Sequence, residues 1–173
     1  MIIFGEKGIK ASKLRSDFSD AYIWMDYVSV PQVHKANQGL AIASISGYVG
    51  ISDLFIVLSG AWSHADDGSI RDVRAWGERG WCRLENLANS LSPTQKSFIV
   101  AQSATSIFSY GPSGMIGRLW YDEVVGTGNF AVEADSSLGH PILQMIALRK
   151  GMAEDSGDLP FYRFLCAMTN KLL

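Results

Sequence analysis

The sequence has little of what marks an exported, metal-binding or membrane protein. It has only two cysteines, Cys82 and Cys166, and their spacing fits neither a metal clip nor a disulfide framework. Its three histidines lie far apart, which predicts no metal site. No apolar run approaches the roughly 18 residues of a membrane span, and no export signal opens the chain. We therefore expect a cytoplasmic protein with no membrane partner.

A strong charge of either sign is also missing. The chain has 15 Lys and Arg against 17 Asp and Glu, a formal charge of -2, which gives no electrostatic footprint for nucleic acid. Hydrophobic residues make up 47% of the 173 residues, which excludes intrinsic disorder. This length fits a single domain over residues 1–173 with one core.

Apolar runs alternate with amphipathic segments along the first two thirds of the chain. The pattern predicts, in order, a buried central strand at 21–30, a helix at 37–50, a strand at 53–59, a polar loop at 60–79, a helix at 81–91 and a strand at 96–102. Strand, helix and strand in this order call for a right-handed crossover. The sequence therefore predicts an α/β fold with a parallel sheet.

The remaining segments carry weaker patterns. We expect a brief helix near 9–18 and short strands near 118–121 and 130–133. Two amphipathic helices, 138–152 and 159–173, are predicted to close the chain.

The candidate chemistry lies beyond the carboxyl ends of the predicted strands, where open parallel sheets bind ligands. On the helix over 81–91, Trp81 and Glu85 share a face offset from the apolar stripe, so Glu85 can look into a cleft beside the sheet. The alternative is that Glu85 pairs with a nearby arginine while Trp81 anchors the helix. Cys82 lacks a recognisable histidine partner, which favours a buried structural thiol.

Two polar residues belong to the first predicted strand and its exit: Asp26 interrupts the strand, and Gln32 follows it. Asp26 stands within an apolar run, where an unpaired carboxylate would cost several kcal/mol, so it needs a partner. It either caps the amides of the next segment or holds a ligand group. For Gln32 the sequence favours two roles equally, supporting the loop or contacting a ligand.

Four motifs agree in order and spacing with one family. They are W-x-D-x-x-S-x-P-Q at 24–32, A-I-x-S-I at 41–45, an apolar strand ending in Leu58 and Ser59, and R-G-W-C-R-x-E at 79–85. Together, over residues 20–102, they resemble a TIR-like domain of the Toll/interleukin-1 receptor homology superfamily, of the type found in microbial eukaryotes.

The resemblance implies a flavodoxin-like three-layer fold with a central parallel sheet. Only residues 1–4 are left to serve as the family's first strand, so a sheet without a full first strand is expected. The resemblance also implies that the loop over 32–38 takes part in self-association with copies of the chain or with other TIR-like domains.

The resemblance further assigns a reaction to Glu85. In members that cleave NAD, the glutamate of this motif is the catalytic residue, and a carboxylate suits the oxocarbenium-like charge that develops on the ribose. NAD would be the substrate, with no other cofactor and no metal. The residues assigned to substrate binding are Trp81 or Trp62, as a stacking partner for nicotinamide, together with Ser59, Asp26 and Gln32.

Three functions remain open from the sequence. The first is a TIR-type NAD glycohydrolase that uses Glu85. The second is a non-catalytic TIR-like adaptor in signalling, which self-associates through 32–38 and the helix at 37–50. The third is a nucleoside deoxyribosyltransferase, which would prefer free nucleosides to NAD.

Overall fold

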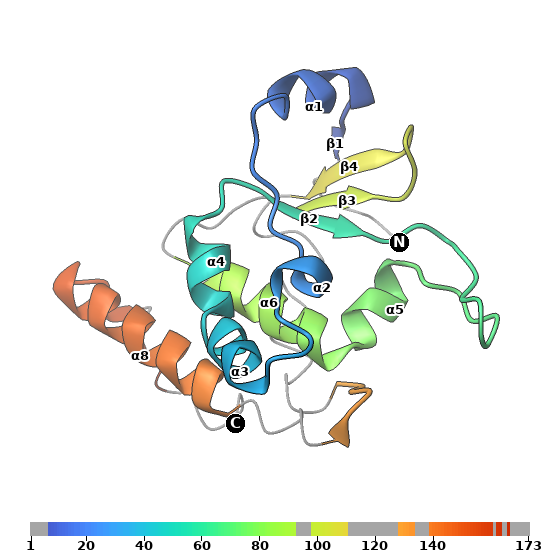
Figure 1. Cartoon of the computed structure of the whole chain (residues 1–173). Helices are drawn as coiled ribbons and strands as arrows, with labels where there is room; N and C mark the ends of the chain where they lie inside the picture. The colour runs from blue at the N-terminus through green and yellow to red at the C-terminus, as the bar shows by residue number, and fades with distance from the viewer. Residues whose placement is uncertain are drawn as a thin grey trace.

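A computed structural model describes residues 7–92, 98–110, 128–133, 139–160, 162–163 and 166 of the chain. These residues form a mixed α/β fold in which a small sheet is packed against helices (Figure 1). No helix in these ranges is both long and apolar enough to cross a membrane.

The sheet is partly parallel. Its strand order is β1-β4-β3-β2, with β1 at Lys7–Gly8, β2 at Phe55–Leu58, β3 at Phe98–Ala101 and β4 at Ile107–Tyr110. Strands β2 and β3 run parallel, with Val57 opposite Val100, whereas β4 pairs antiparallel with both β3 and β1. The strands predicted at 53–59 and 96–102 are confirmed, and they pair in parallel. The crossover predicted between 21–30 and 53–59 is wrong, because residues 21–30 form no strand.

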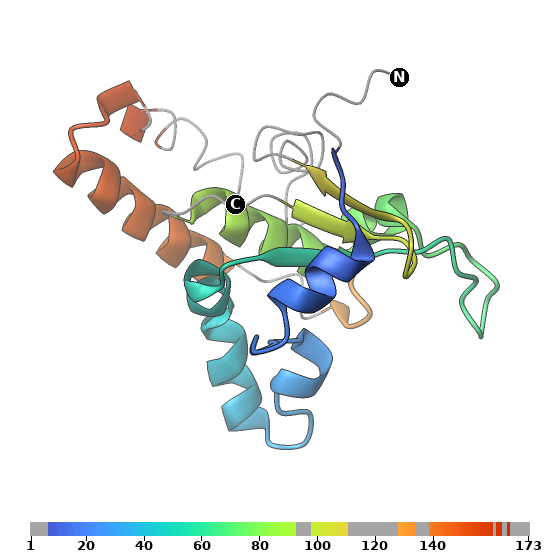
Figure 2. The same cartoon turned by 90° about the horizontal axis from the view of Figure 1, so that it is seen from above.

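Helices cover one face of β2. The helices of the described chain are α1 (Ala11–Asp17), α2 (Asp26–Ser29), α3 (Lys35–Ala43), α4 (Ile45–Ile51), α5 (Val73–Glu78), α6 (Gly80–Leu91) and α8 (Gly139–Asp155). Val57 packs with Val73 and Trp76 of α5, whereas Ile56 and Leu58 on the opposite face are 42% and 61% exposed. Seen from above, α6 runs beneath the sheet and α1 lies above it (Figure 2).

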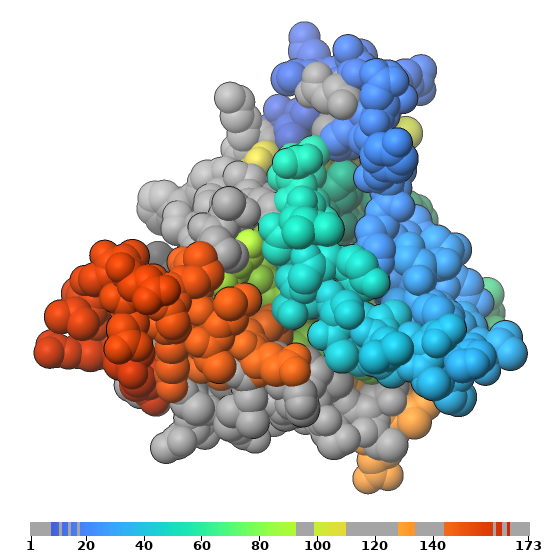
Figure 3. Space-filling view, turned by 60° about the vertical axis from the view of Figure 1, so that its left-hand side comes forward, coloured from blue at the N-terminus to red at the C-terminus, as the bar shows by residue number. Residues whose placement is uncertain are grey.

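The main core lies where α4, α6 and α8 meet. It contains the buried residues Ile45, Val49, Leu84, Leu87, Ala88, Leu91, Met145 and Ile146. Figure 3 shows α8 beside α4 on one face of the molecule. The stripe Leu84, Leu87 and Leu91 is the one that the sequence predicts for this helix, and its burial confirms the helix at 81–91.

The strand predicted at 21–30 is wrong. Residues 21–25 have no regular structure, and α2 follows them. Short-range hydrogen bonds replace a strand ladder: Ser29 N–H donates to the Met25 carbonyl at 2.8 Å, and Met25 N–H donates to Ser29 Oγ at 3.1 Å. Serine and aspartate side chains often compete with regular pairing in this way.

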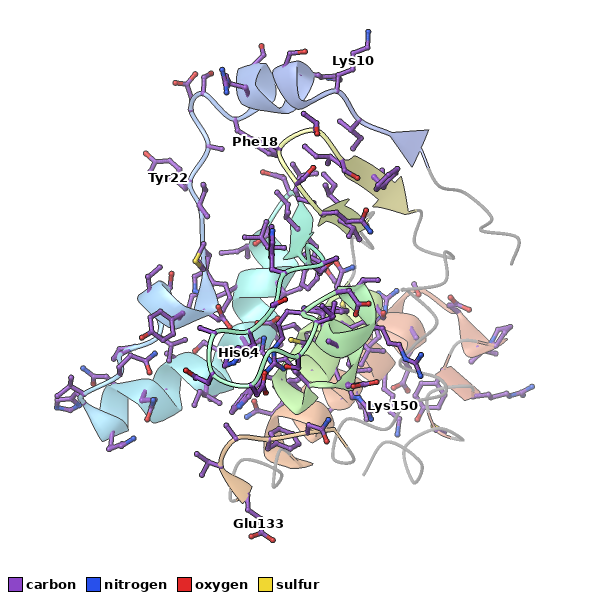
Figure 4. The ribbon with its side chains drawn as sticks, turned by 90° about the vertical axis from the view of Figure 1, so that its right-hand side faces the viewer. Lys10, Phe18, Tyr22, His64, Glu133 and Lys150 are labelled. Carbon is purple, nitrogen blue, oxygen red and sulfur yellow. The ribbon has the colours of Figure 1, made fainter. Side chains whose placement is uncertain are left out.

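Most apolar side chains of the segment at 21–30 lie in solvent, although Trp24 packs on the main core and stacks on Tyr48. Tyr22 is fully exposed and Tyr27 and Val28 are about three-quarters exposed. Figure 4 shows Tyr22 pointing away from the rest of the molecule. Apart from Trp24, the apolar composition of this segment is therefore not explained by burial within the described chain.

Two other predictions are corrected in detail. The helix predicted at 37–50 is divided into α3 and α4 at Ser44, whose hydroxyl donates to the Leu40 carbonyl at 2.8 Å and favours a bend. The polar segment 60–79 is not all loop, because Asp72 accepts a hydrogen bond from Ala75 N–H and starts α5.

Further along the chain, residues 130–133 form no strand, and only Asn129 bridges to Arg79. The helices expected near 9–18 and at 138–152 are confirmed as α1 and α8. The predictions at 1–4 and 118–121, and most of the helix at 159–173, lie outside the described residues.

Candidate functional site

Glu85 lies in the second turn of α6, and the start of that helix is held by a distant segment. Gly80 N–H donates to the Asn129 carbonyl at 3.0 Å, and Asn129 N–H donates to the Glu78 carbonyl at 2.8 Å. A Cβ atom on Gly80 would overlap the ring of Phe130. Glycine at this position therefore lets the 128–130 segment pack closely against the α5–α6 junction.

Burial makes the Glu85 carboxyl a weaker acid than an exposed glutamate. Loss of hydration raises the pKa of Glu85 above its ordinary value of 4.5, to about 7. The negative charge of Asp26 raises this pKa further, whereas the positive charge of Arg79 lowers it. At neutral pH the protonated and ionised forms are therefore both populated, as is typical of catalytic carboxyls.

Cys82 lies one helical turn before Glu85 and is unreactive at neutral pH. Its side chain is 4% exposed, and burial raises the pKa of the thiol to about 12. Since the thiolate is the nucleophilic form, Cys82 is not a nucleophile at neutral pH. The sequence prediction of a buried thiol is confirmed, and both cysteines are free.

Asp26 approaches Glu85 from a different part of the chain. It is the first residue of α2, and its Oδ1 accepts a hydrogen bond from Tyr27 N–H at 2.7 Å. The premise that Asp26 is buried in a strand is wrong, because its side chain is exposed. Its charge nevertheless acts on Glu85 and Cys82, which places all three carboxyl and thiol groups in one neighbourhood.

A small hollow lies at the carboxyl end of β2. Its volume is about 60 Å³, and it is lined by Leu58, Arg71, Asp72, Ala75, Trp76 and Arg79. Arg79 joins this hollow to the Glu85 neighbourhood, because the same guanidinium lowers the pKa of Glu85. The position agrees with the rule that α/β sheets bind ligands beyond the carboxyl ends of parallel strands.

Ser59 and Trp62 follow β2 directly. Ser59 is 2% exposed, its N–H donates to the Ala101 carbonyl at 3.1 Å, and its Oγ has no hydrogen-bond partner in the described part of the chain. Trp62 is 55% exposed, and its carbonyl accepts from Arg71 N–H at 2.8 Å. Trp62 is thus tied to the hollow through Arg71, but no described contact joins either residue to Glu85.

Trp81 and Gln32 have mainly structural contacts. The Trp81 ring packs on the core and meets the ring of Phe130 edge-on, with centroids 6.3 Å apart. Gln32 donates through Nε2 to the carbonyls of Val30 at 2.8 Å and Tyr27 at 3.3 Å. These contacts agree with the structural alternatives that the sequence left open for both residues.

The loop over 60–72 is ordered by its own hydrogen bonds. Ser63 pairs with Ile70, and Gly68 turns the chain with a φ of +67°. Asp67 Oδ1 accepts from Ser69 N–H at 2.9 Å and Asp67 Oδ2 pairs with Arg71 at 3.2 Å. The bonds from Ser69 hold the pKa of Asp67 below its ordinary value. His64 marks this loop in Figure 4.

A second hollow, of about 470 Å³, lies far from these residues. It is formed by β1, the start of α1 and the turn before β4, with Lys10 and Thr105 among its lining. None of the predicted site residues lines it. No group of three metal-ligating side chains occurs in the described ranges.

The structure therefore brings together Glu85, Asp26 and Arg79, of which the sequence predicts the first two. Arg79 was missed as a site residue, although it is the first residue of the R-G-W-C-R-x-E motif. Comparisons with protein-family models, with curated proteins and with solved structures find no match to this chain.

Proposed function

We propose that this chain is a TIR-like NAD glycohydrolase with a flavodoxin-like fold, in which Glu85 cleaves the bond between nicotinamide and ribose. The observation that supports this most is the environment of Glu85, a partly buried carboxyl on which the charges of Asp26 and Arg79 both act. Asp26 belongs to the motif at 24–32, and Arg79 and Glu85 belong to the motif at 79–85. A cytoplasmic setting, which suits two free cysteines, belongs to the same proposal.

The reaction needs a carboxylate at the sugar. The C1′–N1 bond breaks and its electron pair goes to nicotinamide, which loses its positive charge. Positive charge develops on the ribose and is stabilised by the ionised Glu85, and water then adds to C1′ and releases a proton. The products are nicotinamide and ADP-ribose, and no other cofactor is required.

Replacing the Glu85 carboxylate by an amide tests the proposal. Glu85→Gln keeps the shape of the side chain but removes the charge, so nicotinamide release from NAD is expected to fall about a thousandfold. Release is measured by chromatography at high protein concentration. Glu78→Gln is the matched control, because Glu78 is an exposed glutamate of α5 and should keep full activity.

The opposite outcome is equally clear. If the folded chain releases no nicotinamide, or if Glu85→Gln releases it as fast as the unchanged chain, the glycohydrolase proposal is wrong. Release from free nucleosides in preference to NAD would instead favour a nucleoside deoxyribosyltransferase.

A non-catalytic adaptor is the second candidate function. It is favoured by the exposed apolar side chains in α2 and on both sides of it, namely Tyr22, Ile23, Met25, Tyr27, Val28 and Val33. Monomeric proteins rarely leave so many large apolar groups together in solvent. An adaptor would associate with other TIR-like domains or with its own copies, so sedimentation would show concentration-dependent association without NAD turnover.

A further inference from the structure

Arg79 is the cation that the hollow beyond β2 offers to a ligand. It is the residue before α6, its side chain is exposed, and none of the ion pairs in the described part of the chain includes Arg79. Arg83, one turn later, differs because its Nε donates to the Gly77 carbonyl at 2.9 Å. The Arg79 guanidinium therefore has its donors available in the described structure.

Arg71, the second arginine that lines the hollow, is positioned by residues that do not line it. Arg71 pairs with Asp67 at 3.2 Å, and its N–H is fixed to the Trp62 carbonyl. The acidic lining residue Asp72 is occupied, because its Oδ1 accepts from Ala75 N–H at 2.9 Å. Two arginines, Arg71 and Arg79, thus line a small hollow together with one carboxylate that already has a partner.

The volume of the hollow indicates the size of the group that it can hold. A volume of about 60 Å³ is several times the roughly 10–15 Å³ that one water molecule needs, so the hollow has room for a small group such as a phosphoryl group. Guanidinium groups bind phosphate oxygens through charge-assisted hydrogen bonds, which are the strongest kind available to side chains.

We infer that the hollow between Arg71 and Arg79 binds the diphosphate of the dinucleotide substrate, an inference that rests on the proposed NAD hydrolysis. Arg79 then has two neighbours, the diphosphate on one side and the Glu85 carboxyl on the other. Since the nicotinamide ribose is attached directly to the diphosphate, binding there directs that sugar towards Glu85. The site therefore selects a dinucleotide over a free nucleoside, which lacks the phosphates.

Binding of ADP-ribose separates this inference from the reaction. Isothermal titration is done with the intact chain carrying Glu85→Gln, so that no turnover is required. Adding Arg79→Gln is expected to weaken ADP-ribose binding at least about tenfold, because one charged hydrogen-bond donor to phosphate is lost. Arg74→Gln is the matched control: Arg74 belongs to α5, is 87% exposed, pairs with Glu78 and does not line the hollow. It should change the affinity less than about twofold.

Each outcome decides the inference. An equal loss of affinity in Arg79→Gln and Arg74→Gln would reflect general charge and would overturn it, as would no ADP-ribose binding by the folded chain. If the unchanged chain cleaves NAD but Arg79→Gln alters neither the KM for NAD nor the ADP-ribose affinity, the diphosphate site is wrong while the glycohydrolase stands. If ADP-ribose binding needs Arg79 but no nicotinamide is released, the site stands and the glycohydrolase is wrong.

Discussion

Glu85→Gln is expected to raise the free energy of unfolding by about 3 kcal/mol at pH 8 and to change it little near pH 4. The effect arises because the folded chain holds the Glu85 carboxyl in a partly buried place beside Asp26, where ionisation is unfavourable. Glutamine has nearly the same shape and carries no charge, so it avoids this cost at every pH.

The direction follows from the two pKa values of Glu85. In the unfolded chain the carboxyl ionises near 4.5, and in the folded chain near 7. The folded state therefore binds more protons between these values, and the stability of the unchanged chain falls as the pH rises through this window. Below pH 4.5 both states are protonated and the cost disappears; above pH 7 it is complete.

Urea unfolding at a pH below and a pH above this window measures the effect. The exposed control Glu78→Gln should differ from the unchanged chain by less than about 0.5 kcal/mol at either pH. A Glu85→Gln difference that is the same at both pH values would show that Glu85 ionises normally in the folded chain, and the site described here would then be wrong.

Leu87→Ala is expected to destabilise the fold by about 2 to 5 kcal/mol. Leu87 has no exposed surface and packs in the cluster that α4, α6 and α8 share. Shortening it removes apolar burial and leaves a cavity that three packed helices cannot easily close. Leu148→Ala on α8 is the control, because Leu148 is 65% exposed and its loss should cost less than about 0.5 kcal/mol.

Thermal or urea unfolding of the two leucine variants decides this prediction. Similar stabilities for Leu87→Ala and Leu148→Ala would mean that the helices do not meet as described. Since α6 also holds Glu85, a correct result supports the placement of the site as well as that of the core.

The sequence predicts the elements whose signals are local and periodic. The apolar stripe on α6 predicts both a helix and its buried face, and the apolar runs that become β2 and β3 predict buried strands. The run at 21–30 has an equally strong apolar composition, yet a strand also needs a neighbour to bond, and composition cannot reveal whether one exists. Strand β4 was missed for the opposite reason, since its four residues include Ser109 and depend on pairing with β3.

Spacing alone places Glu85 on a face of α6 offset from the apolar stripe, but Glu85 lines neither of the two hollows described. Its acidity could not be predicted, because Asp26 comes from a distant part of the chain and Arg79 reaches Glu85 from the α5–α6 junction. Folding alone brings these charges together, and the sequence pattern gives no distance between them.

The most direct test of the account is the rate of nicotinamide release from NAD as a function of pH. In the proposed reaction the ionised form of Glu85 is the active one, so the rate should rise with pH and reach half its maximum near pH 7. Asp26→Asn should move this midpoint to lower pH, since it removes the charge that raises the pKa of Glu85. A rate that does not change between about pH 5 and about pH 9 would contradict a catalytic role for Glu85.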